Sequence, residues 1–201
     1  MTPQAVILDF GGVLTRFQSP DAVAALGVIA GLSADEMRHR YWQHRSAYDG
    51  GLPARDYWLR VLEGTRTTNA EATIAQLIEV DIASWLNYRE AVWDLTRAFR
   101  AAGGRTAMLS NGVPEIVRVI RQQRPLEQWF DVAVISCDVD CQKPDAAIYR
   151  MCLDQMGIAA REALFVDDLP ANLDGARAVG LDTLHFTGDE SVEALRIRLG
   201  L

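Results

Sequence analysis

Short apolar runs alternate with helical patterns from about residue 90 onward, and this alternation constrains the fold more than any other feature of the sequence. The apolar runs predict strands over residues 5–8, 105–109, 132–135, 163–166 and 182–186. The helical patterns cover residues 89–102, 113–123, 145–157, 171–179 and 190–199. Strands that alternate with helices are typical of a parallel sheet with helices on its faces. We therefore expect an α/β fold.

Residues 16–88 break this rhythm, since they contain no convincing alternating strand. Four helical stretches are predicted instead, near residues 20–31, 33–48, 53–63 and 68–80. Ser33 followed by Glu36 is a capping-box pattern, and Pro53 suits the first turn of a helix. We expect a core formed by residues 1–15 and 89–201, with an all-helical subdomain inserted at residues 16–88.

Polar residues follow the ends of the predicted strands, where ligands gather in open α/β sheets. Asp9 follows the first strand and precedes a glycine turn at Gly11 and Gly12, which lets a substrate approach the main chain closely. Three later strands lead into Ser110-Asn111-Gly112, Lys143-Pro144-Asp145, and Asp167-Asp168 with Asn172. Together they offer a nucleophile, a donor to phosphate oxygens, a cation and a Mg²⁺ site, which suits phosphoryl transfer.

Each of these segments also has a purely structural interpretation. Asn111-Gly112 is a common turn dipeptide, and Asp168 could cap a helix that begins near Pro170. Lys143 could be solvated, but Pro144 at a first helical position would place it beside a positive helix end, which is unfavourable without an anion. Adjacent carboxylates repel each other, so a metal is the simpler explanation for the acidic pair.

In this order, the four segments resemble the four motifs of the haloacid dehalogenase-like (HAD) hydrolase superfamily. The resemblance covers the whole chain and is densest across residues 104–187. It is nearest to the C1-capped subfamily I, in the glycine-containing branch that includes sugar phosphatases and the N-terminal domain of soluble epoxide hydrolases. It implies a three-layer Rossmann-like core, with the first strand central in a parallel sheet, and a helical C1 cap at residues 16–88.

The resemblance also implies roles for the residues in these motifs. Asp9 would attack phosphorus and form an aspartyl-phosphate that water then hydrolyses. The implied ligands of Mg²⁺ are Asp9, the carbonyl of Gly11, Asp167 and Asp168, with one of the acidic pair bound directly and the other through water. The implied phosphate-binding residues are Gly11, Gly12, Ser110, Asn111 and Lys143. Lys143 would also hold Asp9 ionised, and Asn172 would orient metal-bound water or Lys143.

Gly11 departs from the pattern of the related phosphatases, which carry a second aspartate at this position as general acid and base. Such assistance contributes about 10²–10⁴-fold to a rate. Three outcomes remain open: slow turnover, replacement by a cap residue such as His44 or Tyr48, or a leaving group that needs little protonation. Anomeric sugar phosphates and acyl phosphates have leaving groups of the last kind.

The segment from Arg38 to Arg45 is the one locally basic stretch with interleaved aromatic residues. It could face the active site, so that His44, Arg45 and Tyr48 contact the substrate. Alternatively, it could present a packed stripe of Met37, Tyr41, His44 and Tyr48 and a solvated basic face.

The leading hypothesis is a Mg²⁺-dependent phosphomonoester hydrolase that acts on a small phosphorylated metabolite, a sugar phosphate being one candidate. A 2-haloacid dehalogenase is the first alternative, because its nucleophile motif also lacks the second aspartate. Such enzymes need no metal, which would leave Asp167 and Asp168 unexplained. A weakly active relative that only binds a phosphometabolite is the second alternative, and only Gly11 favours it.

Composition bounds the partners of the chain. A formal net charge of −7 argues against general nucleic-acid binding, which needs a basic surface. No apolar run approaches the roughly 20 residues that cross a bilayer, and the N-terminus does not resemble a signal peptide. Cys137, Cys141 and Cys152 form an odd, unpatterned set, which favours reduced thiols and a cytoplasmic protein. We expect a monomer or a homodimer.

Overall fold

The computed structural model describes residues 2–201 and contains one five-stranded parallel sheet. Its strands lie in the order β3-β2-β1-β4-β5, so the first strand is central, as the resemblance implied. Their bounds are Ala5–Leu8 for β1, Arg105–Ser110 for β2, Val132–Ile135 for β3, Ala163–Asp167 for β4 and Asp182–His185 for β5. The α/β, Rossmann-like fold is therefore confirmed.

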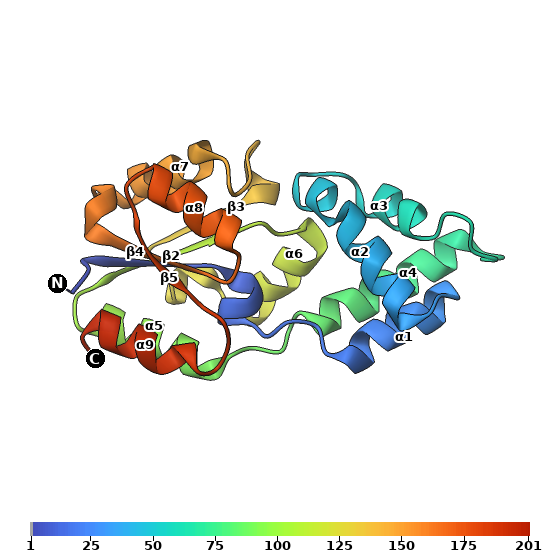
Figure 1. Ribbon diagram of the computed structural model, residues 1–201, viewed down its shortest axis with the longest axis horizontal. Helices are drawn as coiled ribbons and strands as arrows, with labels where there is room; N and C mark the ends of the chain where they lie inside the picture. The colour runs from blue at the N-terminus through green and yellow to red at the C-terminus, as the bar shows by residue number, and fades with distance from the viewer. Residues whose placement is uncertain (1) are drawn as a thin grey trace.

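Helices cover both faces of this sheet (Figure 1). Their bounds are Glu90–Ala101 for α5, Pro114–Gln123 for α6, Ala146–Met156 for α7, Pro170–Ala178 for α8 and Ser191–Leu199 for α9. Successive strand residues point to opposite faces. Val6 and Leu8 accordingly belong to the apolar cluster that includes residues of α5, α6 and α9. Ala5 and Ile7 belong to the second cluster, which includes residues of α7 and α8.

Between β1 and α5 the chain forms four helices, which lie to one side of the sheet in Figure 1. Their bounds are Pro20–Ala30 for α1, Ala34–Asp49 for α2, Ala54–Val61 for α3 and Ala70–Ser84 for α4. Two connecting segments join this group to the core, and they meet in an antiparallel bridge between Thr15 and Tyr88. We refer to α1–α4 as the cap. None of the helices within residues 2–201 has the length and apolar character needed to cross a membrane.

Several local features differ from the sequence-based expectations. Residues Phe10–Leu14 form a π-type turn, η1, that no periodicity predicted, and three 3₁₀ turns follow at Leu126–Gln128, Ser136–Asp138 and Ala160–Glu162. Ser33 caps α2, but Glu36 pairs with Arg40 at 2.7 Å instead of completing a capping box.

The expected place of Pro144 at a first helical position was wrong, and the alternative role of Asp168 as a helix cap is not observed. Helix α7 begins at Ala146 with Asp145 as its N-cap, so Pro144 precedes the helix and does not occupy its first position. Asp168 does not cap α8, whose N-cap residue is Leu169; the main-chain amide of Leu169 instead donates to Asp167 Oδ1 at 2.8 Å. The electrostatic argument about Lys143 and a helix end therefore does not apply, and the side chain of Asp168 is left for another role.

Candidate active site

Strand register places the carboxylates of Asp9 and Asp167 side by side. Leu8 pairs with Val166, so the next residue of each strand is an aspartate at the carboxyl end of the sheet. The amide of Asp9 donates to the carbonyl of Val166 at 2.9 Å, which continues this pairing by one residue. The strand order reverses between β1 and β4, which is where ligand sites form in such sheets.

Lys143 lies between these two carboxylates. Its Nζ is 2.8 Å from Asp9 Oδ1 and 2.6 Å from Asp167 Oδ2, and all three side chains are buried. Burial lowers the pKa of Lys143, but the two carboxylates outweigh this effect and raise it overall. Lys143 is the only lysine in a sequence that otherwise uses arginine as its basic residue. A compact ammonium bridges two carboxylate oxygens from different strands, whereas the planar fork of arginine favours a single bidentate partner.

Asn111 positions the main chain of Lys143. Its Nδ2 donates to the Lys143 carbonyl at 2.9 Å, while its Oδ1 accepts from the Lys143 amide at 2.8 Å. The side chain of Asn111 is thus engaged, and its main chain is what remains for a phosphate. Ser110, at the end of β2, is buried, and its hydroxyl makes only a long contact of 3.4 Å with the Asn111 carbonyl.

Asp167 is fully buried, and its hydrogen-bonding capacity is largely used. Asn172 Nδ2 lies 3.0 and 3.1 Å from its two oxygens, Leu169 donates to one of them, and Lys143 donates to the other. The Tyr149 hydroxyl donates to the Asn172 carbonyl at 2.8 Å, which fixes the start of α8. Asn172 therefore contacts Asp167 and reaches Lys143 only through it.

Asp9, Asp167 and Asp168 form the acidic cluster of the site. One carboxylate oxygen from each residue lies within 4.8 Å of the others. Burial raises the pKa of Asp9 to about 6 against the opposing effect of Lys143, and burial together with Asp9 raises the pKa of Asp168 to about 8. Three carboxylates facing one ammonium leave negative charge uncompensated. Hard oxygen donors in this arrangement fit a divalent cation such as Mg²⁺.

The two glycines of the η1 turn differ in what their surroundings allow. Gly12 has φ of +75°, and a Cβ there would lie 2.8 Å from Asp168 Cγ, so only glycine fits beside the acidic cluster. Gly11 has φ of −66°, and a Cβ there would lie 3.4 Å from the indole ring of Trp85. A side chain from the end of the cap therefore packs over the position where related phosphatases carry their second aspartate.

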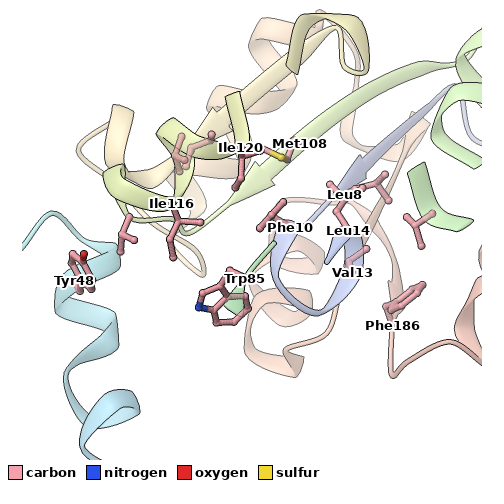
Figure 2. Close-up of a cluster of buried hydrophobic side chains, with 14 of the residues drawn as sticks. Leu8, Phe10, Val13, Leu14, Tyr48, Trp85, Met108, Ile116, Ile120 and Phe186 are labelled. Atoms are coloured by element: carbon pink, nitrogen blue, oxygen red, sulfur yellow. The ribbon is translucent and has the colours of Figure 1, made fainter. Parts of the chain in front are cut away.

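A cavity of about 140 Å³ opens onto Asp9 between the sheet edge and the cap. From the core its lining includes Asp9, Gly11, Ser110, Asn111, Lys143, Asp168 and Asn172, and from the cap side Phe17, Trp42, Arg45, Asp49 and Trp85. Apolar side chains of β2, β3 and α6 complete its wall, and Figure 2 shows Ile116, Ile120 and Met108 in one cluster with Phe10 and Trp85.

Arg45 lines the cavity, but His44 and Tyr48 do not, so the structure separates the three candidate substrate contacts on the cap. Tyr48 donates to Glu115 at 2.9 Å and stacks on Tyr57 with ring centroids 4.4 Å apart. Neither His44 nor Tyr48 stands where it would replace an acid at Gly11.

The buried stripe of α2 consists of Met37, Tyr41, Arg45 and Tyr48, so the expected stripe was wrong at His44. Arg45 is buried because Asp49 accepts from its Nε at 2.8 Å and Asp81 lies 3.9 Å from its guanidinium. Asp49 and Trp85 were missed as site residues. The four-residue spacing of Arg45 and Asp49 on one helix could have indicated Asp49. Nothing in the local sequence indicated Trp85.

A family model described as haloacid dehalogenase-like hydrolase matches residues 3–180. The chain therefore belongs to the haloacid dehalogenase-like hydrolase family, and a phosphatase is among its relatives. The parallel sheet, the order of the four segments and the acidic cluster agree with this membership.

Relatives of two activities are similar to this chain. It is 39% identical to a phosphoserine phosphatase of Thermus thermophilus over 101 residues, 47% of this chain and 40% of the relative. It is 32% identical to (S)-2-haloacid dehalogenase 1 of a Pseudomonas species over 99 residues, 49% of this chain and 43% of the relative. The matches thus span about two fifths of the length of each relative.

A solved structure shows the same fold. It is an Asp-to-Ala variant of a HAD family enzyme from Bacteroides thetaiotaomicron in complex with magnesium and inorganic phosphate. The TM-score is 0.71 at 17% identity, and the match covers 90% of this chain and 92% of that one.

Proposed function

We propose that this protein is a Mg²⁺-dependent phosphomonoester hydrolase that acts on a small phosphorylated metabolite through an aspartyl-phosphate at Asp9. The observation that carries the proposal is the acidic cluster of Asp9, Asp167 and Asp168 with Lys143 at its edge. A cluster of three carboxylates suits a metal that binds a phosphate, whereas a metal-free dehalogenase would have no use for Asp168. The magnesium and phosphate held by the structural relative, and the phosphatase among the sequence relatives, support this choice.

Within this proposal, Asp168 would hold the metal directly and Asp167 would act through water. Asp167 already accepts from Asn172, Leu169 and Lys143, whereas Asp168 is less buried and lines the cavity. Asp9 Oδ1 accepts from both Phe10 and Lys143, which leaves Oδ2 to face the cavity. The carbonyl of Gly11 would complete the protein ligands. Bound Mg²⁺ would neutralise negative charge on the phosphate oxygens.

Each residue of the site would then have its own role in the reaction. The Asp9 carboxylate attacks phosphorus, the bond from phosphorus to the ester oxygen breaks, and its electron pair leaves with that oxygen. Lys143, the Ser110 hydroxyl and the main chain at Asn111 stabilise the charged oxygens of the transferring group. Water then attacks the aspartyl-phosphate, which releases inorganic phosphate and restores the Asp9 carboxylate. Gly12 keeps the space beside Asp168 open.

The test measures phosphate release from a panel of phosphorylated metabolites and halide release from 2-haloacids, each with Mg²⁺ and with a chelator. We expect phosphate release that requires Mg²⁺ and is lost in Asp9→Asn. Halide release that persists in the chelator would identify a dehalogenase. If wild type and Asp9→Asn are equally inert but a phosphometabolite binds, the protein is a binding relative.

We further propose a cytoplasmic location, which the free thiols of Cys137, Cys141 and Cys152 support, because thiols stay reduced in that compartment. The proposed partner is a small phosphate ester, not a nucleic acid or a membrane. A monomer or a homodimer stays a prediction that sedimentation would test.

A further inference from the structure

Trp85 closes the space over Gly11 on the side of the cap. Its ring would contact a Cβ at Gly11, and its position is fixed because its Nε1 donates to the Tyr41 hydroxyl at 2.9 Å. That hydroxyl in turn donates to the buried Asp81 at 2.8 Å. A side chain at Gly11 would thus begin in van der Waals contact with an aromatic ring that is anchored in the cap.

Trp85 belongs to an aromatic wall that three separate segments build. Phe17 comes from the first connecting segment, Trp42 from α2 and Trp85 from the end of α4. The rings of Phe17 and Trp42 lie edge-on to Trp85, with centroids 6.1 and 6.4 Å away. All three side chains line the cavity that opens onto Asp9.

The wall continues to the mouth of the cavity as exposed apolar surface. Among residues 2–201, five large apolar side chains are exposed, and three of them line this cavity: Phe17 at 49%, Trp42 at 47% and Leu169 at 51%. Single exposed apolar side chains scattered over a protein surface are normal and need no explanation. When several of them gather around one pocket, they indicate that the pocket binds an apolar ligand. A hydroxyl-rich sugar would find few partners on this side.

The cavity also offers no free acid to a leaving group. Its carboxyl groups are those of Asp9, Asp49 and Asp168. Asp9 is the nucleophile and Asp168 the metal ligand of the proposed function, and Asp49 accepts from Arg45 at 2.8 Å. With all three carboxyl groups engaged in this way, a leaving group that departs without a proton from a side chain suits this site best.

From these two observations, and on the basis of the proposed function, we infer that the substrate is an aryl phosphate monoester, whose phenolic ring packs against Phe17, Trp42 and Trp85. Phenols have a pKa near 10, far below that of an alkyl alcohol, so a phenolate leaves without a general acid. In the step, Asp9 forms a bond to phosphorus and the bond from phosphorus to the aryl oxygen breaks. The electron pair stays on the phenolate, which takes its proton from solvent, and water then hydrolyses the aspartyl-phosphate.

Four substrates separate ring binding from leaving-group chemistry. Phenyl phosphate has both an aromatic ring and a phenolate leaving group, whereas benzyl phosphate keeps the ring but leaves as an alkoxide. Acetyl phosphate has a good leaving group without a ring, and glycerol 3-phosphate has neither feature. With Mg²⁺ present, we expect kcat for phenyl phosphate to exceed that for benzyl phosphate by about 10²–10⁴-fold, since this is what a missing general acid costs.

Three variants test the site itself. Trp42→Ala should raise KM for phenyl and benzyl phosphate by about 3- to 10-fold and leave KM for acetyl phosphate unchanged. Ile197→Ala removes another exposed apolar side chain, on α9 and outside the cavity lining, and should change none of these constants. Asp49→Asn should preserve the ratio of phenyl to benzyl turnover, because Asp49 is not the acid.

The inference is overturned if glycerol 3-phosphate or benzyl phosphate turns over within tenfold of phenyl phosphate, or if Trp42→Ala raises KM equally for all four. A selective loss of benzyl phosphate turnover in Asp49→Asn would also overturn it, because Asp49 would then be the acid. Each of these results leaves the phosphatase proposal standing. Inactivity toward all four compounds, when another phosphate ester of the metabolite panel is hydrolysed with Mg²⁺ present, also overturns the inference alone. Inactivity toward the four compounds and the whole panel contradicts both proposals.

Discussion

At the scale of single residues, Lys143 is the electrostatic centre of the site. It is the only cation in contact with the buried carboxylates of Asp9 and Asp167 among the described residues. Removing one partner of a buried ion pair leaves an uncompensated charge, which costs about 3–5 kcal/mol. The lysine therefore supports folding as well as phosphate binding.

Replacing Lys143 with methionine tests this role. We expect Lys143→Met to lower the free energy of unfolding by about 3–5 kcal/mol in chelator, with part of the loss recovered when Mg²⁺ supplies positive charge. Urea unfolding followed by circular dichroism measures both values. Arg105→Met, at an exposed position of β2, is the matched control and should change stability by less than about 0.5 kcal/mol. Equal stability of Lys143→Met and wild type would refute the account of Lys143.

Some residues of the cavity could be predicted from the sequence and others could not, for a physical reason. Asp9, Ser110, Lys143 and Asp168 were predicted because each follows a strand, and the carboxyl ends of parallel strands meet at one edge. Trp85 follows the last cap helix and reaches the cavity only through the way in which the cap packs on the core. Such contacts depend on tertiary arrangement, which no local pattern encodes.

At the scale of elements, α2 and α4 are joined by a buried polar network inside the cap. Asp81 on α4 accepts from the Tyr41 hydroxyl at 2.8 Å and lies 3.9 Å from the guanidinium of Arg45. Burial raises the pKa of Asp81, and Arg45 opposes this only in part; burial likewise raises the pKa of Asp49. Tyr57, from α3, also faces the network.

These shifts set the sign of a pH dependence. Because the folded protein holds the Asp81 proton more tightly than the unfolded chain, the contribution of this carboxyl to stability is present in acid. It is lost as the pH rises through the raised pKa. The stability of wild type relative to Asp81→Asn should therefore fall as the pH rises above about 4, the ordinary pKa of an aspartate. Arg45 stays protonated throughout this range and therefore adds nothing to the pH dependence of stability.

Urea unfolding of both proteins across this pH range measures the difference. Asp174→Asn, which alters an exposed surface pair with Arg177, serves as the control and should show little change with pH. If wild type instead becomes more stable relative to Asp81→Asn as the pH rises, the direction assigned to the pKa of Asp81 is contradicted.

Secondary structure could be predicted well where local pattern determines it. Four of the five strands are mainly apolar runs, whereas β5 has the mixed sequence Asp-Thr-Leu-His. The nine predicted helices match observed ones to within a few residues because caps such as Ser33 and Gly157 mark their ends. The η1 turn could not be predicted, because Gly11 and Gly12 allow many conformations and neighbouring strands select one. Pro144 was expected at a first helical position but precedes α7, because proline is compatible with both a first helical turn and the residues before it.

At the scale of the whole molecule, the sheet brings together residues from opposite ends of the sequence. Strand β1 lies between β2 and β4, so Asp9 meets Ser110 on one side and Asp167 and Asp168 on the other. On the cap side, Trp42 and Arg45 of α2 and Trp85, which follows α4, line the cavity that opens onto Asp9. The sequence implied this order by resemblance, but only the folded chain shows that the cap excludes His44 and admits Arg45.

The most direct test of the central claim is to trap the phosphoryl group on the protein during turnover. Phenyl phosphate and Mg²⁺ are added, the reaction is quenched with borohydride, which reduces an aspartyl-phosphate to homoserine, and the peptides are mapped by mass spectrometry. We predict homoserine at Asp9 alone, in the presence of Mg²⁺ and not in chelator. Phosphate release without modification of Asp9, or modification that appears equally in chelator, would contradict the account.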